Sequence, residues 1–80
     1  MNAIGDYSNV ISRYPENIYA LYQRAKAYDL ITRKDAAILD YDKIIGISKV
    51  QAVDDECLTY SKARSFELKR ESVKPVIAIS

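Results

Sequence analysis

The chain has 80 residues, of which 49% are apolar and 29% charged, and its 12 basic and 11 acidic residues leave a net charge of +1. A chain of this length makes one small domain, and the balanced charge excludes the basic face that a nucleic acid or an anionic membrane surface requires. Without a membrane-length apolar run, a basic leader or a second cysteine beside Cys57, we expect a protein that stays intracellular, in the cytoplasm, and does not insert into membranes.

The first predicted helix spans residues 2–14. Its apolar residues recur every three or four positions and therefore share one face: Ala3, Tyr7, Val10, Ile11 and Tyr14. Pro15 ends it, because a proline disfavours the helical conformation of the preceding residue.

The second predicted helix spans residues 18–31. Asn17 is the expected N-cap, since its side chain can accept a hydrogen bond from a free backbone amide. The apolar stripe of this helix consists of Leu21, Ala25, Tyr28 and Ile31.

The third helix, residues 35–47, starts at Asp35, whose charge and side chain suit a helix N-terminus. The fourth, residues 53–70, begins at the acids 54–56 and has the stripe Cys57, Tyr60, Ala63 and Phe66. Residues 73–80 contain Pro75 and form a predicted irregular tail.

These elements predict an all-α fold of about four helices within residues 1–72. The links are only a few residues long, so consecutive helices are expected to be antiparallel neighbours. No segment shows the two-residue alternation of a strand.

The chain also repeats itself. "AIGDYSNVI" (3–11) matches "AILDYDKII" (37–45), 34 residues later, and "YQRAKAY" (22–28) matches "YSKARSF" (60–66), 38 residues later. Two kinds of helix thus recur in alternation, and self-similarity near this period is typical of a helical solenoid.

This pattern resembles the tetratricopeptide repeat over roughly residues 2–70, and the resemblance implies a short right-handed α-solenoid of helix-turn-helix units. Its alanines are expected where two helices nearly touch, and its aromatic residues between successive helices. The matching positions are Ala3, Tyr7, Pro15, Leu21, Ala25, Tyr28, Ala37, Tyr41, Ala63 and Phe66.

The sequence departs from that family at Thr32 and Lys34, where a glycine and an aromatic residue are preferred. Lys49 replaces a second closing proline, and the third link is four residues longer than the pattern. The RNA-reading pentatricopeptide repeat has a similar period, but the charge balance disfavours it, and Pro15 and Tyr41 fit the tetratricopeptide pattern better.

The residues for catalysis, metal binding or cofactor binding are not found in the sequence. It has no histidine, and its two glycines cannot form a phosphate-binding loop. Cys57 has no histidine partner and fits a buried apolar position, the acids 54–56 fit a helix N-terminus, and Asp40 and Asp42 fit a solvated face. We therefore expect no enzyme, no metal and no cofactor.

The resemblance further implies that the second and fourth helices line a concave groove for a protein or peptide partner. The expected groove residues are Tyr19, Tyr22, Gln23, Lys26, Asp29, Tyr60, Ser61 and Arg64. Lys26 and Arg64 would attract an acidic peptide, or are ordinary exposed charges. The family's carboxylate clamp is not predicted, because Gln23 replaces its middle asparagine and the outer pairs are missing.

The main hypothesis is thus a non-enzymatic interaction module or scaffold. The alternative is a structural segment without a ligand, which stacks on the rest of a longer repeat protein or associates with itself through the first helix. That helix is expected to expose Ile4, Val10 or Ile11. Any catalytic activity would reside on residues outside this chain.

Overall fold

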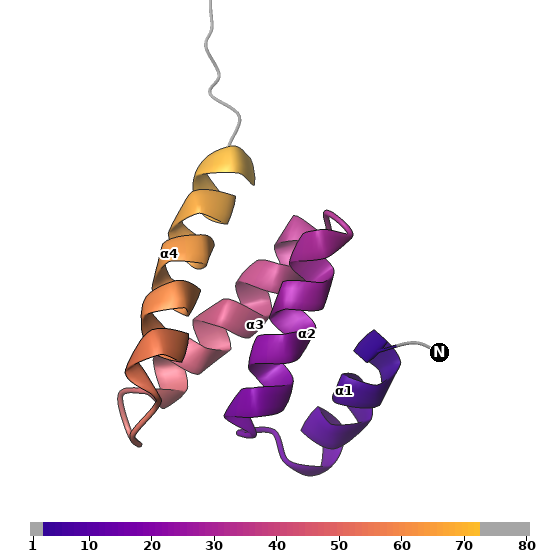
Figure 1. Cartoon of the computed structure of the whole chain (residues 1–80), viewed down its shortest axis with the longest axis vertical. Helices are drawn as coiled ribbons and strands as arrows, with labels where there is room; N and C mark the ends of the chain where they lie inside the picture. The colour runs from indigo at the N-terminus through magenta and orange to yellow at the C-terminus, as the bar shows by residue number, and fades with distance from the viewer. Residues whose placement is uncertain (1–2, 73–80) are drawn as a thin grey trace, which may run out of the picture.

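The computed structural model describes residues 3–72, which are all-helical with no strand among them. The four helices are α1 (Ala3–Arg13), α2 (Ile18–Leu30), α3 (Lys34–Ile47) and α4 (Asp55–Ser72). The predicted bounds agree with them to within about two residues. Each helix packs on the next, and α1 and α4 lie at the two ends of the array (Figure 1). The residues of the predicted irregular tail, 73–80, and Asn2 lie outside the described residues.

The helix starts follow local signals in two cases out of the three predicted. Asn17 caps α2, and its Oδ1 accepts a hydrogen bond from the Ala20 amide at 3.0 Å. Asp54 accepts one from the Cys57 amide at 3.3 Å, at the start of α4. The prediction that Asp35 caps α3 is wrong: the cap position is Arg33, whose side chain makes no capping bond, and Asp35 lies within the first turn. There its charge still complements the helix dipole.

The turn from α2 to α3 closes with the pair of hydrogen bonds that defines a Schellman motif. The Arg33 amide donates to the Tyr28 carbonyl at 2.8 Å, and the Thr32 amide donates to the Asp29 carbonyl at 3.1 Å. This geometry requires a left-handed residue after the helix cap, a position usually held by glycine. Thr32 takes it with φ 64°, so the sequence departure noted at this position coincides with a strained backbone.

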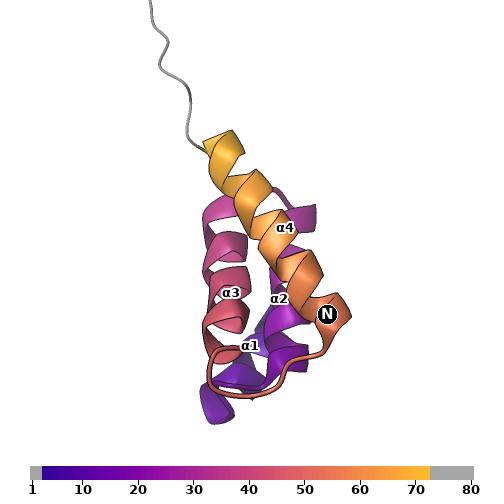
Figure 2. The ribbon, with the colours of Figure 1, turned by 90° about the vertical axis from the view of Figure 1, so that its left-hand side faces the viewer.

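The core consists of two adjoining clusters. Leu21, Ile44, Ile47 and Cys57 form one, and Ala25, Ala37, Tyr41 and Leu68 form the other. Ala25 and Ala37 have no exposed surface, which agrees with the prediction that α2 and α3 approach closely at these alanines. Figure 2 shows α3 alongside α4, with α2 behind.

The predicted packing stripe of α4 is wrong at Ala63 and Phe66. Ala63 is exposed and the Phe66 side chain is 62% exposed, whereas the helix face toward α3 carries Cys57, Ser61, Ser65 and Leu68. The serines are small enough for close helix approach, and the Ser65 hydroxyl donates a hydrogen bond to Asp42 of α3. Ala63 and Phe66 of the predicted stripe therefore lie on the outer face of α4.

Two aromatic or aliphatic residues at helix ends were also predicted to pack and do not. Tyr14 and Ile31 are 62% and 55% exposed, because each lies just beyond the last residue of its helix. In α1, Ile4 and Ile11 are half-buried, Ile11 against the core cluster that contains Leu21, and Val10 is exposed.

Asp40 was predicted to be solvated and is instead buried, with 4% of its surface exposed. Arg24 neutralises it with two hydrogen bonds of 2.7 Å and also donates to the Ser8 hydroxyl at 2.9 Å. A single α2 side chain thus joins α1 to α3.

Candidate functional site

Aromatic side chains of α2 and α4 meet on the side of the array where the groove was predicted. The Tyr22 and Tyr60 rings pack edge to face with their centroids 5.6 Å apart. Tyr60 also contacts the buried Tyr41 ring, with the centroids 6.0 Å apart. Two helices far apart in the sequence are therefore held side by side by ring contacts.

A hollow of about 350 Å³ opens next to these rings. It is lined by Lys26, Asp29, Leu30, Tyr60 and Arg64. Four of these five were predicted as groove residues. Leu30 was missed, although it lies one helical turn after Lys26 and is 85% exposed.

Lys26 provides the free positive charge of the hollow. Its Nζ lies 4.7 Å from the Tyr22 ring centroid and 6.0 Å from that of Tyr60, within the range of cation–π attraction. No carboxylate of residues 3–72 forms an ion pair with it. The ammonium is therefore positioned by two aromatic faces and remains available to an incoming anion.

Arg64 has a different role from the one predicted for it. Its guanidinium makes two hydrogen bonds of 2.8 Å to Asp29 and a third, also of 2.8 Å, to Glu67. The bonds to Asp29 raise the pKa of Arg64 further above its ordinary value. Because two carboxylates already neutralise this residue, it links α4 to α2 and adds little attraction for a partner.

Tyr41 packs against the Tyr60 ring beside the hollow and is itself fully buried. Its hydroxyl donates to Asp29 over a long 3.4 Å contact, and burial raises its pKa far above the usual tyrosine value. Burial likewise raises the pKa of Tyr22. Both phenols therefore stay protonated at neutral pH, and their rings pack against Tyr60.

The remaining predicted groove residues are not gathered at this hollow. Tyr19 is 66% exposed and packs edge to face against Tyr7 of α1, with the ring centroids 6.3 Å apart. Gln23 is half-buried. Ser61 is completely buried, so its assignment to the groove is wrong; among residues 3–72 its hydroxyl has no hydrogen-bond partner.

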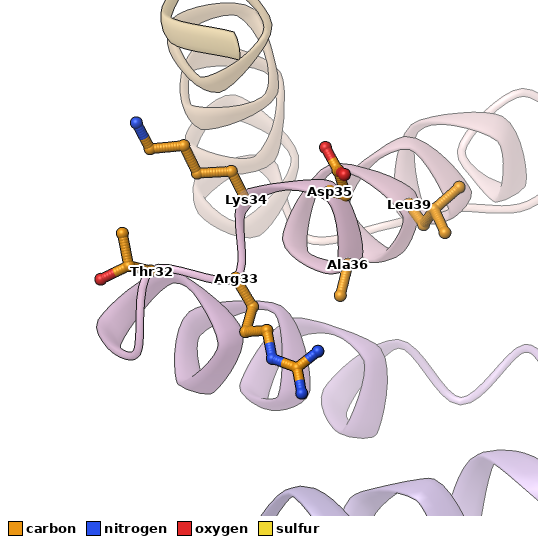
Figure 3. Close-up of a pocket in the computed structure, with 6 residues that line it drawn as sticks. All are labelled: Thr32, Arg33, Lys34, Asp35, Ala36 and Leu39. Atoms are coloured by element: carbon orange, nitrogen blue, oxygen red, sulfur yellow. The ribbon is translucent and has the colours of Figure 1, made fainter.

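A larger hollow, of about 590 Å³, lies at the α2–α3 turn and was not predicted. Figure 3 shows that the side chains of Arg33 and Lys34 point away from each other there. Lys34 pairs with Glu71 at 3.1 Å, and Leu39 is 71% exposed. Without converging polar groups, this open surface lacks the features of a binding site.

Within the described part of the chain, no three acidic, cysteine or histidine side chains gather as metal ligands. None of the described helices combines the length and apolar character needed to cross a membrane. Comparison of the chain with family models, curated proteins and solved structures finds no match. The tetratricopeptide resemblance therefore stays a prediction.

Proposed function

We propose that this chain is a protein-interaction module of the tetratricopeptide type, which holds an extended acidic peptide between α2 and α4. The observation that carries the proposal is the position of Lys26. Its ammonium lies beside Tyr22 and Tyr60 and has no ion pair among the described residues. A carboxylate of the peptide would pair with this ammonium and neutralise its charge.

The surroundings of Lys26 favour a peptide that presents an acidic and an apolar side chain on the same side. Exposed Leu30 and the ring of Tyr60 line the same hollow as the cation and offer apolar contacts. In an extended peptide, neighbouring side chains point in opposite directions and next-nearest ones to the same side. A segment with an acidic residue two positions from an apolar one would satisfy both features.

The proposal can be tested by titrating two fluorescent peptides into the purified chain. One repeats the unit Glu-Ser-Leu-Ser, so that each Glu lies two positions from a Leu, and the other has Gln in place of each Glu. Lys26→Glu should weaken binding of the acidic peptide at least about fivefold, the size expected when a cation–anion contact becomes repulsive. Binding of the Gln peptide should be weak and unchanged.

Lys43→Glu is the matched control, because Lys43 is exposed on α3 and forms no ion pair in the described structure. Reversal of Arg64 is unsuitable, since it would place two carboxylates together at Asp29 and disturb the fold. Equal loss in the Lys43 and Lys26 variants, or equal affinity for both peptides, would contradict the proposal.

A further inference from the structure

The two self-matches of the sequence correspond to a repeated packing arrangement. By these matches α3 is equivalent to α1, and α4 is equivalent to α2. In the structure α2 is covered on two sides, by α1 and by α3. By contrast, α4 lies at the end of the array and has only one helix, α3, packed extensively against it among the described helices (Figure 1). The surface that α3 covers on α2 therefore has an equivalent on α4 that no described helix covers.

The covered surface of α2 shows what such an interface needs. Ala25 meets α3 at Ala37, and both are fully buried. Beside them, Arg24 forms its two-bonded ion pair with Asp40. Small residues at the centre and opposite charges at the edge thus define the contact between α2 and α3.

The equivalent residues of α4 are uncovered. Lys62 corresponds to Arg24, Ala63 to Ala25, and Phe66 to Tyr28. All three are exposed, and Phe66 leaves 62% of its surface to solvent. Spacings of three and four place Ala63, Phe66 and Thr59 on one strip of the helix, with Lys62 at its edge.

The complementary surface is at the opposite end of the same chain. In α1, Ala3 corresponds to Ala37, Asp6 to Asp40, and Val10 to Ile44. All three are exposed. Asp6, like Lys62, forms no ion pair within residues 3–72. One end of the array therefore carries a free cation next to an alanine, and the other carries a free anion three residues from an alanine.

We propose that the α4 face of one copy (Thr59, Lys62, Ala63 and Phe66) binds the α1 face of a second copy (Ala3, Asp6 and Val10). The contact would repeat the packing of α3 on α2, with Ala3 against Ala63 and Asp6 paired with Lys62. Opposite charges at equivalent positions favour this occupant over a copy presenting the same α4 face, which would bring two Lys62 side chains together.

This association joins two different surfaces, so it is heterologous and does not close in a pair. Each added copy presents a new α4 face, and the array can grow. Thr59 and Ala63 lie on the side of α4 away from its buried face. Lys62 and Phe66 lie at the edge of this strip, where they line a shallow hollow with Ile45 of α3, whereas Tyr60 and Arg64 line the separate hollow with Lys26. The inference is therefore independent of peptide binding.

The test is the solution mass of the full chain, measured by sedimentation over a series of concentrations up to about millimolar, where weak interfaces are populated. The expected weight-average mass rises from that of the 9.1 kDa monomer and does not level off at twice that value. Asp6→Lys or Lys62→Glu alone should raise the dissociation constant at least about fivefold, and the chain with both reversals should regain association.

Ala63→Gln, at an exposed position, should block association without altering the helical circular dichroism. Lys43→Glu is again the matched control and should associate like the parent chain. A 9.1 kDa monomer at every concentration would overturn the proposal. So would a dimer that is insensitive to Asp6→Lys, because a symmetric contact through α4 does not involve α1.

Discussion

Arg24 and Asp40 form a two-bonded ion pair across α2 and α3, with Nε–Oδ2 and Nη2–Oδ1 distances of 2.7 Å. Asp40 is almost completely buried, and Arg24 extends the link to Ser8 of α1. These hydrogen bonds raise the pKa of Arg24 above its ordinary value. Ala25 and Ala37 of the same two helices are fully buried, so this polar contact, which reaches three helices, accompanies a closely packed core.

Asp40→Ala should be strongly destabilising. It leaves the Arg24 guanidinium partly buried without its carboxylate, and removal of one member of a buried pair typically costs about 3–5 kcal/mol. That cost is comparable to the whole stability of a domain of this size. Urea denaturation followed by circular dichroism should show a large fall in the midpoint. The double change Arg24→Met and Asp40→Leu should recover much of the loss, and a double variant as unstable as Asp40→Ala would contradict this account.

Stability should fall at alkaline pH because of Tyr41. Burial raises its pKa far above 10.0 in the folded protein, so the folded state keeps a proton that the unfolded state releases. Tyr41 therefore leaves the stability unchanged below pH about 10, where it is protonated in both states. At higher pH, each further unit lowers the free energy of unfolding by about 1.4 kcal/mol until the folded state also loses the proton. The raised pKa of Tyr22 acts in the same direction.

Tyr41→Phe separates this effect from others. At neutral pH the change should cost about 1 kcal/mol or less, since the hydroxyl donates only one long hydrogen bond. Above pH about 10 the variant should lose stability less steeply than the parent chain. The comparison needs urea denaturation of both chains at neutral pH and at pH about 11, and equal alkaline slopes would refute the assignment to Tyr41.

Local signals predicted the helices, because the causes of helix formation lie within a few residues of each other. The repeat pattern predicted the close approach of α2 and α3. Asn17 caps the residues that follow it, and the alanines Ala25 and Ala37 were placed by the repeat pattern. Of the predicted groove residues, Lys26, Tyr22 and Tyr60 lie side by side, while their role in binding stays a prediction.

The errors arose where the environment of a residue is set by distant partners. Ser61 and Ser65 resemble surface residues in sequence, but both are buried on the face of α4 that packs on α3. Their small volume allows close approach of the helices, and Ser65 also donates a hydrogen bond to Asp42. Arg64 was treated as a free charge, and its partner Asp29 lies 35 residues earlier in the chain. Asp40 is buried for the same reason, since Arg24 neutralises it. Such pairs become visible only when the helices are assembled.

Gly46→Ala should stabilise the protein. Gly46 lies within the last turns of α3, and a Cβ at this position would meet no atom within 4 Å. Alanine reduces the backbone entropy lost on folding and is favoured in helices by about 0.5–1 kcal/mol over glycine. For a domain of this size the melting temperature should rise by about 4 °C. A lower melting temperature would mean that Gly46 has a conformational role that its open surroundings do not indicate.

Thr32→Gly should also stabilise the protein, for a different reason. Thr32 holds the left-handed position of the Schellman motif with φ 64°, which crowds the Cβ of a branched residue. Glycine removes this strain and loses some of the gain to its greater freedom in the unfolded chain, so the expected net increase is about 0.5–1 kcal/mol. Thr32→Asn should give a smaller gain, because asparagine tolerates this conformation, and Thr32→Ala little or none, because it keeps the Cβ. Urea denaturation of the three variants checks this order. If alanine stabilised the chain as much as glycine, the branched side chain itself, and not the left-handed backbone, would be the source of the strain.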